Sequence, residues 1–280
     1  MTKTVVLLTI HGMGEGDTAT GEISSDDDIT YPNDMIEAME RTFEERWQKV
    51  EIVKIYYQGF LQPNELDYYR KTQRKMSWHP LRKLAINGIA DAGSLEYSRA
   101  TEGGPYYLTQ GHIMEKLGAA HDNVGGSSPP VVVLAHSLGC EVISNYIWDA
   151  NKETKTYGFW EKAERESPQG PRLEFQKLTT LKAMITTGCN IPMFIAGLRP
   201  EERVPIDKPT DDFTWDNYYD KDDVLGYPLE ALSEDYGKLV TDHAIRVGNL
   251  FTGWNPFSHN EYWKSRTIRN ALADQLEHYI

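Results

Sequence analysis

The chain has 280 residues, of which 40% are hydrophobic and 25% charged, and its formal net charge is −13. This is the composition of a soluble globular protein with room for one large domain, and the negative charge argues against a nucleic-acid partner. The two cysteines, Cys140 and Cys189, suggest neither a disulfide framework nor a metal site, so we expect a reduced, cytoplasmic setting and no metal. No apolar run approaches the roughly 18 residues of a membrane span.

Short apolar runs alternate with segments of helical periodicity along the chain. Val5–Ile10 predicts a first buried strand, residues 32–47 predict an amphipathic helix, and residues 261–280 predict a terminal one. Further strands are predicted at 51–57, 131–135, 178–188, 213–219 and 243–248. Strands separated by helices predict an α/β fold, with a mostly parallel sheet of about six strands covered by helices on both faces.

Two stretches interrupt this alternation. Residues 15–32 are polar, acidic and aperiodic, which predicts a long loop after the first strand. Residues 58–128 contain helical segments without a clear strand, and they are longer than one crossover connection requires. We therefore expect a single domain over residues 1–280 with a helical cap inserted at 58–128.

The segment VVVLAHSLG at 131–139 runs from a predicted strand directly into a predicted helix, with Ser137 at the junction. A nucleophile presented above a parallel sheet needs a sharp, strained turn, and the residues two before and two after it must be small. Ala135 and Gly139 occupy those positions. A serine that only caps a helix would also suit the pattern, but the strand before it and the amphipathic helix after it favour a nucleophile elbow.

A nucleophilic serine also requires donors for the oxyanion that develops during acyl transfer. The backbone N–H of Leu138, at the predicted helix start, is one candidate donor. The HGMG segment at 11–14 follows the first strand and leaves the backbone N–H of Met13 as the second. His-Gly-x-Gly is more often a simple turn, but here it precedes an elbow, which favours an oxyanion loop.

Together, HGMG, AHSLG, the aspartates of YYDKDDVLGYPL and the histidine of NPFSHNEYW resemble the α/β-hydrolase superfamily, and within it the serine lipases and esterases. The resemblance covers residues 5–280. It implies the family fold and a Ser–acid–His triad in that chain order. The first predicted strand directly precedes the oxyanion loop, so we expect the two N-terminal strands of larger members to be missing.

The triad acid is expected in the loop after a late strand, where the sequence offers Asp220, Asp222 and Asp223. Esterase loops of this kind often read Asp-x-Val-Val, and this pattern assigns the acid to Asp222. Asp223 is the alternative. The remaining aspartates are interpreted as a solvated acidic turn.

The triad base must be a histidine after the acid, which leaves His243, His259 and His278. His243 opens a predicted strand and His278 lies in the last turn of the final helix. His259 is placed between the last strand and the last helix, where the family has its base. Ser258 and Glu261 form a Ser-x-x-Glu pattern that predicts a helix start at His259.

Three other features have simpler interpretations. His136, beside the serine, is expected to pack against the oxyanion loop, and Cys140 is expected to be a buried core residue and not a reactive thiol. A basic cluster surrounds Trp78 and could contact a membrane surface, although a solvated helix face is favoured. Its members are Arg70, Lys71, Arg74, Lys75, Arg82 and Lys83.

The sequence therefore predicts a cofactor-free serine hydrolase that acts on a small carboxylic ester or thioester, with Ser137, Asp222 and His259 as its triad. An amidase or peptidase is the alternative within enzymes. A non-catalytic hydrolase-like binding module is the alternative outside them, because a fold does not guarantee an activity. The complete set of triad residues and oxyanion glycines favours the enzyme.

Overall fold

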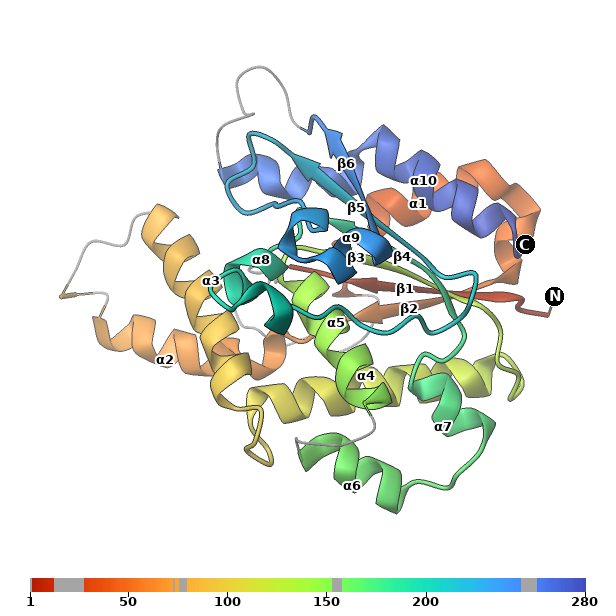
Figure 1. Cartoon of the computed structure of the whole chain (residues 1–280), viewed down its shortest axis with the longest axis horizontal. Helices are drawn as coiled ribbons and strands as arrows, with labels where there is room; N and C mark the ends of the chain where they lie inside the picture. The colour runs from red at the N-terminus through yellow and green to blue at the C-terminus, as the bar shows by residue number, and fades with distance from the viewer. Residues whose placement is uncertain (1, 13–27, 73, 76–79, 153–157, 248–255) are drawn as a thin grey trace.

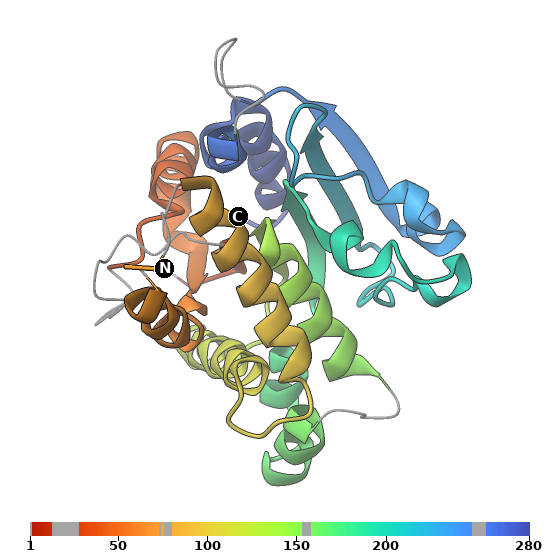
Figure 2. The same cartoon turned by 90° about the vertical axis from the view of Figure 1, so that its left-hand side faces the viewer.

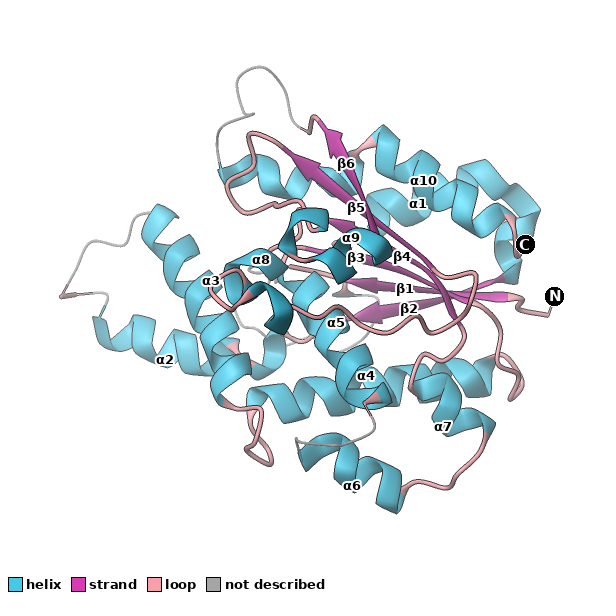
Figure 3. Cartoon of the chain, viewed as in Figure 1, coloured by secondary structure: helices cyan, strands magenta, loops and turns pink. Residues whose placement is uncertain are grey.

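In a computed structural model, described for residues 2–12, 28–72, 74–75, 80–152, 158–247 and 256–280, a parallel sheet lies between two layers of helices (Figures 1 and 3). The sheet has six strands in the order β2-β1-β3-β4-β5-β6, and each neighbouring pair is parallel. This confirms the predicted fold class. The strands are β1 (Val5–Ile10), β2 (Val50–Ile55), β3 (Val131–His136), β4 (Leu181–Thr187), β5 (Thr214–Asp220) and β6 (Val240–Ile245).

The central strands are buried along their whole length. Every residue of β1 and β3 is buried, as expected for strands with helices on both faces, and both strands are apolar except at Thr9 and His136. At the edge, only Val240 of β6 is buried and its other residues are partly or fully exposed. The strand begins three residues before the predicted 243–248 run because Val240 already pairs with Trp215. Each predicted strand therefore corresponds to an observed one, with shifts only at the ends.

One face of the sheet is covered by α1 (Asn33–Phe43) and α10 (Arg266–Glu277), with the 3₁₀ helix η2 (Glu44–Lys49) beside them. The α-helix α1 ends at Phe43 because Glu44 has a φ of 51°, so Trp47 belongs to η2 and not to α1. The apolar stripes of these helices pack on one side of the central strands, and the cluster includes Val5, Leu7, Val132, Leu134, Met35, Met39, Phe43, Ile268, Leu272 and Leu276.

The other face is covered by α4 (Pro105–Asn123), α5 (Leu138–Asn151), α6 (Gly158–Glu166), α7 (Pro171–Gln176) and α9 (Glu234–Leu239). Its core is the larger of the two and includes Val6, Leu8, Val133, Ile113, Leu117, Ile143, Tyr146, Trp160 and Phe175. The chain also forms the short helices α8 (Ile191–Ile195), η3 (Gln58–Phe60), η4 (Pro200–Glu202), η5 (Glu230–Leu232) and η6 (Pro256–Lys264).

The predicted insertion at 58–128 divides into two parts. The helices α2 (Gln62–Thr72) and α3 (Pro80–Tyr97) lie beyond the carboxyl ends of the strands, and α3 crosses in front of that end when the molecule is turned (Figures 1 and 2). By contrast, Ile113 and Leu117 of α4 pack in one cluster with Val53 and Ile55 of β2. Helix α4 therefore belongs to the layer on the sheet, and only α2 and α3 are placed where a cap would lie.

The basic cluster is partly described. Lys71 forms an ion pair with Asp67 at 2.6 Å on an exposed part of α2, whereas Trp78 and the side chains of Arg82 and Lys83 lie outside the described residues. None of the helices in the described ranges has the length and hydropathy needed to cross a bilayer.

Candidate active site

Ser137 stands in the turn between β3 and α5, at the carboxyl end of the sheet. Its φ of 54° and ψ of −125° are strained for a residue with a side chain. Its backbone N–H donates to the carbonyl of Thr187 at 2.9 Å, which ties the turn to the end of β4. The side chain makes no capping hydrogen bond to α5. The geometry is that of a nucleophile elbow and not of a helix-capping serine.

The residues around this turn are small because backbone passes close to them. A Cβ on Gly139 would collide with the carbonyl oxygen of His11 and lie 2.9 Å from that of Ile10. A Cβ on Gly12 would lie 2.5 Å from the Cβ of Ser137 and 3.1 Å from its Oγ. The segment after β1 therefore runs directly against the serine, and glycine is needed on both sides of the contact.

His259 and Asp223 form a buried hydrogen-bonded pair near the elbow. The Nδ1 atom of His259 lies 2.7 Å from Oδ2 of Asp223, and the two residues are 5% and 8% exposed. Burial alone would raise the pKa of Asp223, but the hydrogen bond and charge interaction with His259, with smaller contributions from Leu225 and Tyr262, leave this pKa below its usual value. The carboxylate is therefore ionised and its hydrogen bonds are charge-assisted.

The carboxylate at His259 belongs to Asp223, whereas the sequence pattern favoured Asp222. The backbone N–H of Asp223 donates to the carbonyl of Asp220 at 3.1 Å and closes a tight turn after β5. In this turn the side chain of Asp222 is exposed, and its backbone N–H donates to Oδ1 of Asp220 at 3.0 Å. Asp220 itself holds the loop, since its Oδ2 accepts from Val247 N–H at 2.6 Å.

His259 lies within η6, just before α10, and so between the last strand and the last helix, as expected. It is inside this 3₁₀ helix and not at its first position, and the side chain of the proposed capping residue Ser258 lies outside the described residues. The two other histidines after the acid are engaged elsewhere. His243 Nε2 lies 2.7 Å from Asp216 Oδ1, and His278 Nδ1 lies 2.7 Å from the carbonyl of Asp274.

Two buried polar atoms at this edge of the sheet have no hydrogen-bond partner in the described part of the chain. The Nε2 of His259 and the Oγ of Ser137 are both buried and unpaired among the described residues. The imidazole of His259 packs against that of His136, the residue before Ser137, with ring centroids 4.7 Å apart. It also lies against Gly188, whose φ is +52° and where a Cβ would lie 2.8 Å from Cε1 of His259.

Two further histidines border the elbow. His136 Nδ1 lies 3.1 Å from both the carbonyl and the hydroxyl of Thr187, and burial, followed by the nearby His259, lowers its pKa to about 3. Its ring also faces Gly12, as expected for packing against the loop after β1. His11 stacks on Tyr57 at 4.6 Å, and burial lowers its pKa to about 4. Both imidazoles are therefore neutral at neutral pH.

Of the two expected oxyanion donors, one lies in the described part of the chain. Leu138 is the first residue of α5, and an N–H in the first turn of a helix has no partner within that helix. Its position directly after Ser137 suits an oxyanion donor. Met13 lies outside the described residues, although Gly12 before it reaches Ser137.

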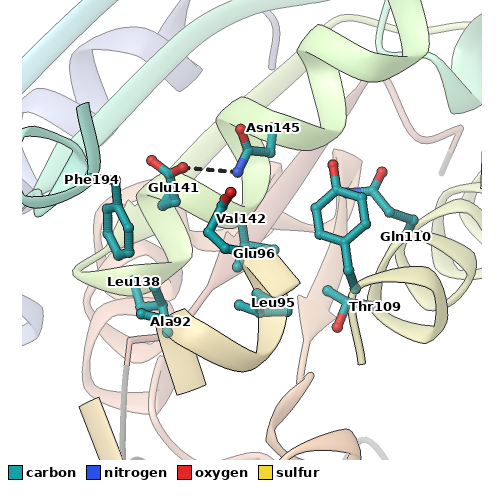
Figure 4. A pocket seen from close by; sticks show the side chains of 11 residues that line it. Ala92, Leu95, Glu96, Thr109, Gln110, Leu138, Glu141, Val142, Asn145 and Phe194 are labelled. Carbon is teal, nitrogen blue, oxygen red and sulfur yellow. Dashed lines mark hydrogen bonds between the residues drawn. The ribbon is translucent and has the colours of Figure 1, made fainter. Parts of the chain in front are cut away.

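A cavity lies against the first turns of α5 (Figure 4). It is narrow and is lined by residues of α3, α4, α5 and α8. Leu138 joins it to the elbow. Inside, Glu141 accepts a hydrogen bond from Asn145 at 2.8 Å, and burial, followed by the negative charge of Glu96, raises the pKa of Glu141 to about 7.

Sequence reasoning missed Tyr262 as part of this site. Its hydroxyl lies 3.0 Å from Oδ2 of Asp223. Residues three apart eclipse one another in a 3₁₀ helix, so Tyr262 and His259 reach the same carboxylate from η6. In the sequence, the only sign of this contact is the three-residue spacing between His259 and Tyr262. That spacing is informative only once the segment is known to be a 3₁₀ helix.

The described residues contain no group of three or more His, Cys, Asp or Glu side chains that could hold a metal ion. Cys140 and Cys189 are both buried and neither is in a disulfide. The burial of Cys140 in the larger core agrees with its interpretation as a packing residue.

Comparisons with known proteins give similarity in structure only. No protein-family model matches the sequence, and no curated protein does. Among solved structures, an acetylxylan esterase aligns with a TM-score of 0.41 and 10% identity, over 100% of this chain and 99% of the esterase. A Xanthomonas campestris pv. campestris protein assigned to the alpha/beta superfamily of hydrolases aligns with a TM-score of 0.37 and 12% identity, over 99% of each chain. The chain has a six-stranded parallel sheet with helices on both faces and a strained strand–Ser137–helix turn at the carboxyl edge, an arrangement of the kind found in α/β-hydrolases.

Proposed function

We propose that this protein is a serine hydrolase that cleaves a carboxylic ester or thioester, with Ser137 as nucleophile, His259 as base and Asp223 as the orienting acid. One observation carries the proposal. Nδ1 of His259 is engaged by Asp223, whereas Nε2 is buried at the same sheet edge as Oγ of Ser137, and neither of these two atoms has a partner among the described residues. A buried polar atom without a partner calls for an explanation, and a catalytic role explains both of these atoms together.

The mechanism follows from the state of the imidazole. Because Nδ1–H donates to the ionised Asp223, Nε2 carries a lone pair and can accept the proton of the Ser137 hydroxyl. The serine oxygen then attacks the carbonyl carbon of the substrate. The resulting oxyanion would be bound by the N–H of Leu138 and, as we propose, by that of Met13.

Collapse of this intermediate breaks the bond to the leaving group, which departs as an alcohol or thiol with the proton from His259, and leaves an acyl group on Ser137. A water molecule then gives its proton to Nε2 and attacks the acyl carbon, which releases the acid and restores the serine. Ser137 follows β3, Asp223 follows β5 and Met13 follows β1, whereas His259 is carried by η6, between β6 and α10.

The test is covalent labelling with a fluorophosphonate probe, which reacts with an activated serine, followed by hydrolysis of p-nitrophenyl esters of increasing chain length and of one p-nitroanilide. The wild type is expected to label and to hydrolyse an ester, and Ser137→Ala to do neither. Ser144→Ala is the matched control, because Ser144 is buried in the same helix but has no part in the proposed mechanism. Labelling that persists in Ser137→Ala, or a wild type that does not label, would contradict the proposal.

A further inference from the structure

We propose that Tyr262 is a positioning residue of this site, whose hydroxyl holds the carboxylate of Asp223 in line with His259; the inference rests on the proposed function. It concerns a residue that touches the acid and not the substrate. The case depends on how the hydrogen bonds around one hydroxyl group are arranged.

The hydroxyl of Tyr262 stands between two segments of the loop after β5. Its oxygen accepts a hydrogen bond from the backbone N–H of Asp220 at 2.8 Å. The same oxygen lies 3.0 Å from Oδ2 of Asp223. A phenol has a single proton, and with Asp220 N–H occupying an acceptor position, that proton is directed to the ionised carboxylate.

The phenol remains a donor over the working pH range. Tyr262 is 1% exposed, and burial, followed by the negative charge of Asp223, raises its pKa. The contact is therefore a charge-assisted hydrogen bond from a neutral hydroxyl to a carboxylate.

This bond shares its acceptor with the base. Oδ2 of Asp223 accepts from both Tyr262 and His259 Nδ1, whereas Oδ1 accepts from Leu225 N–H at 3.0 Å. Three donors thus fix the carboxylate in position and in rotation. Gly226 passes so close that a Cβ there would lie 2.6 Å from Oδ2, so the space beside the carboxylate is also filled.

Loss of the hydroxyl has two expected effects on the pair. The carboxylate keeps Leu225 and His259 but can rotate, which misaligns the imidazole. It also becomes more basic, because a donor that stabilised its negative charge is gone. A more basic carboxylate holds a proton more firmly on its imidazole partner, so the acid limb of the pH–rate profile moves to higher pH. A role in stability alone would move neither the profile nor kcat.

The experiment compares Tyr262→Phe with Tyr146→Phe. Tyr146 is a matched control, because it is equally buried and its hydroxyl donates to the carbonyl of Gln176 at 2.6 Å, outside the site. The values of kcat and KM for a p-nitrophenyl ester are measured across the acid limb. For Tyr262→Phe we expect kcat to fall about tenfold, the loss typical of one hydrogen bond to a charged group, with KM unchanged and the limb at higher pH. Tyr146→Phe is expected to keep the wild-type kcat and profile.

A second replacement keeps the test independent of folding defects. Site-specific 3-fluorotyrosine at position 262 preserves the shape of the ring and makes the hydroxyl a stronger donor, so the acid limb is expected to move to lower pH. The inference would be overturned if both variants had the wild-type kcat and an acid limb of the pH–rate profile that coincides with that of the wild type.

A readout without turnover separates this inference from the proposed function. The proton shared between His259 and Asp223 is expected to give a far-downfield proton resonance that disappears in Asp223→Asn. Tyr262→Phe should displace it and Tyr146→Phe should not. If the wild type does not react with the fluorophosphonate probe but the resonance is displaced in Tyr262→Phe, the serine hydrolase is refuted and the positioning contact stands. If the resonance does not move in Tyr262→Phe, the contact itself is refuted.

Discussion

Asp223 and His259 lie 36 positions apart in the chain, and their side chains meet in a 2.7 Å hydrogen bond. The sheet explains the meeting. Asp223 follows the end of β5 and His259 follows β6, and these strands are parallel neighbours, so their carboxyl ends open on the same edge. Ser137 is presented at that edge by β3. The geometry of these residues and of helix α5, which begins after Ser137, leads to four predictions.

The first prediction separates the two aspartates. Asp223→Asn is expected to lower kcat/KM by roughly a thousandfold or more, because an amide donor facing Nδ1 favours the wrong imidazole tautomer. Asp222→Asn is expected to stay within about twofold of the wild type, since its side chain is exposed on the turn. The measurement is ester hydrolysis by both purified variants. A larger loss of activity in Asp222→Asn than in Asp223→Asn would instead support Asp222 as the triad acid, as expected from the sequence.

The second prediction concerns the coupling of Ser137 and His259. Residues that act as one unit are not additive, so His259→Ala should be about as damaging as Ser137→Ala, and the double variant should be hardly worse than either. The measurement is kcat/KM for the two single variants and the double variant. His243→Ala is the control, because that histidine is paired with Asp216. The assignment of Ser137 and His259 as one catalytic unit would be rejected if the double variant lost kcat/KM by the product of the two single losses, or if His243→Ala lost activity.

The third prediction tests the steric basis of the elbow. In Gly139→Ala the new methyl group meets the carbonyl oxygens of Ile10 and His11, which are backbone atoms with little freedom to move. The thermal midpoint should fall, with a cost of about 1–3 kcal/mol typical of overpacking, and labelling of Ser137 should be lost. Gly93→Ala, in α3, is the matched control. Outside its own helix, no atom of the described residues lies within 4 Å of its Cβ position, so this variant should be neutral or slightly stabilising.

The fourth prediction is a dependence of stability on pH that arises from Glu141. Its pKa in the folded state is raised to about 7, whereas an unfolded glutamate has a pKa of about 4.3. Between these values the folded state binds more protons than the unfolded state, so stability falls as pH rises through this window. The full loss is on the order of 3 kcal/mol above pH 7.

Glu141→Gln removes this titration and keeps an oxygen that can accept from Asn145. The variant should therefore have a higher thermal midpoint than the wild type at pH 8 and little advantage at pH 4. Glu96→Gln, which removes the neighbouring charge, should give a smaller gain of the same sign. Equal midpoints for wild type and Glu141→Gln at both pH values would show that Glu141 is solvated.

Much of this site could be predicted from the sequence because it depends on local patterns. Apolar runs identified β1 and β3, and small residues around Ser137 identified a turn that the observed φ of 54° matches. His259 was reached by elimination and does lie between the last strand and the last helix. Each inference needed only neighbouring residues or chain order.

The remaining features depend on contacts that a linear pattern does not contain. The choice between Asp222 and Asp223 is made by the turn that Asp220 closes, and a shift of one residue reverses which side chain points inward. Helix α4 and helix α3 have similar apolar content, but only packing on β2 assigns α4 to the sheet layer. Tyr262 is recognisable only beside the carboxylate that it contacts.

The parallel sheet also has a kinetic consequence. Its pairings join segments that are remote in the chain, as when Val5 meets Val50 and Val6 meets Val131. Such topologies fold slowly, because long loops must close before the contacts that reward closure exist. The strained turn at Ser137 packs against Ile10 and His11 and is hydrogen-bonded to Thr187, so it depends on two stretches that are remote from it in the chain. During refolding, the turn that presents Ser137 should therefore form only with the slow, global step, and collapsed intermediates should lack it.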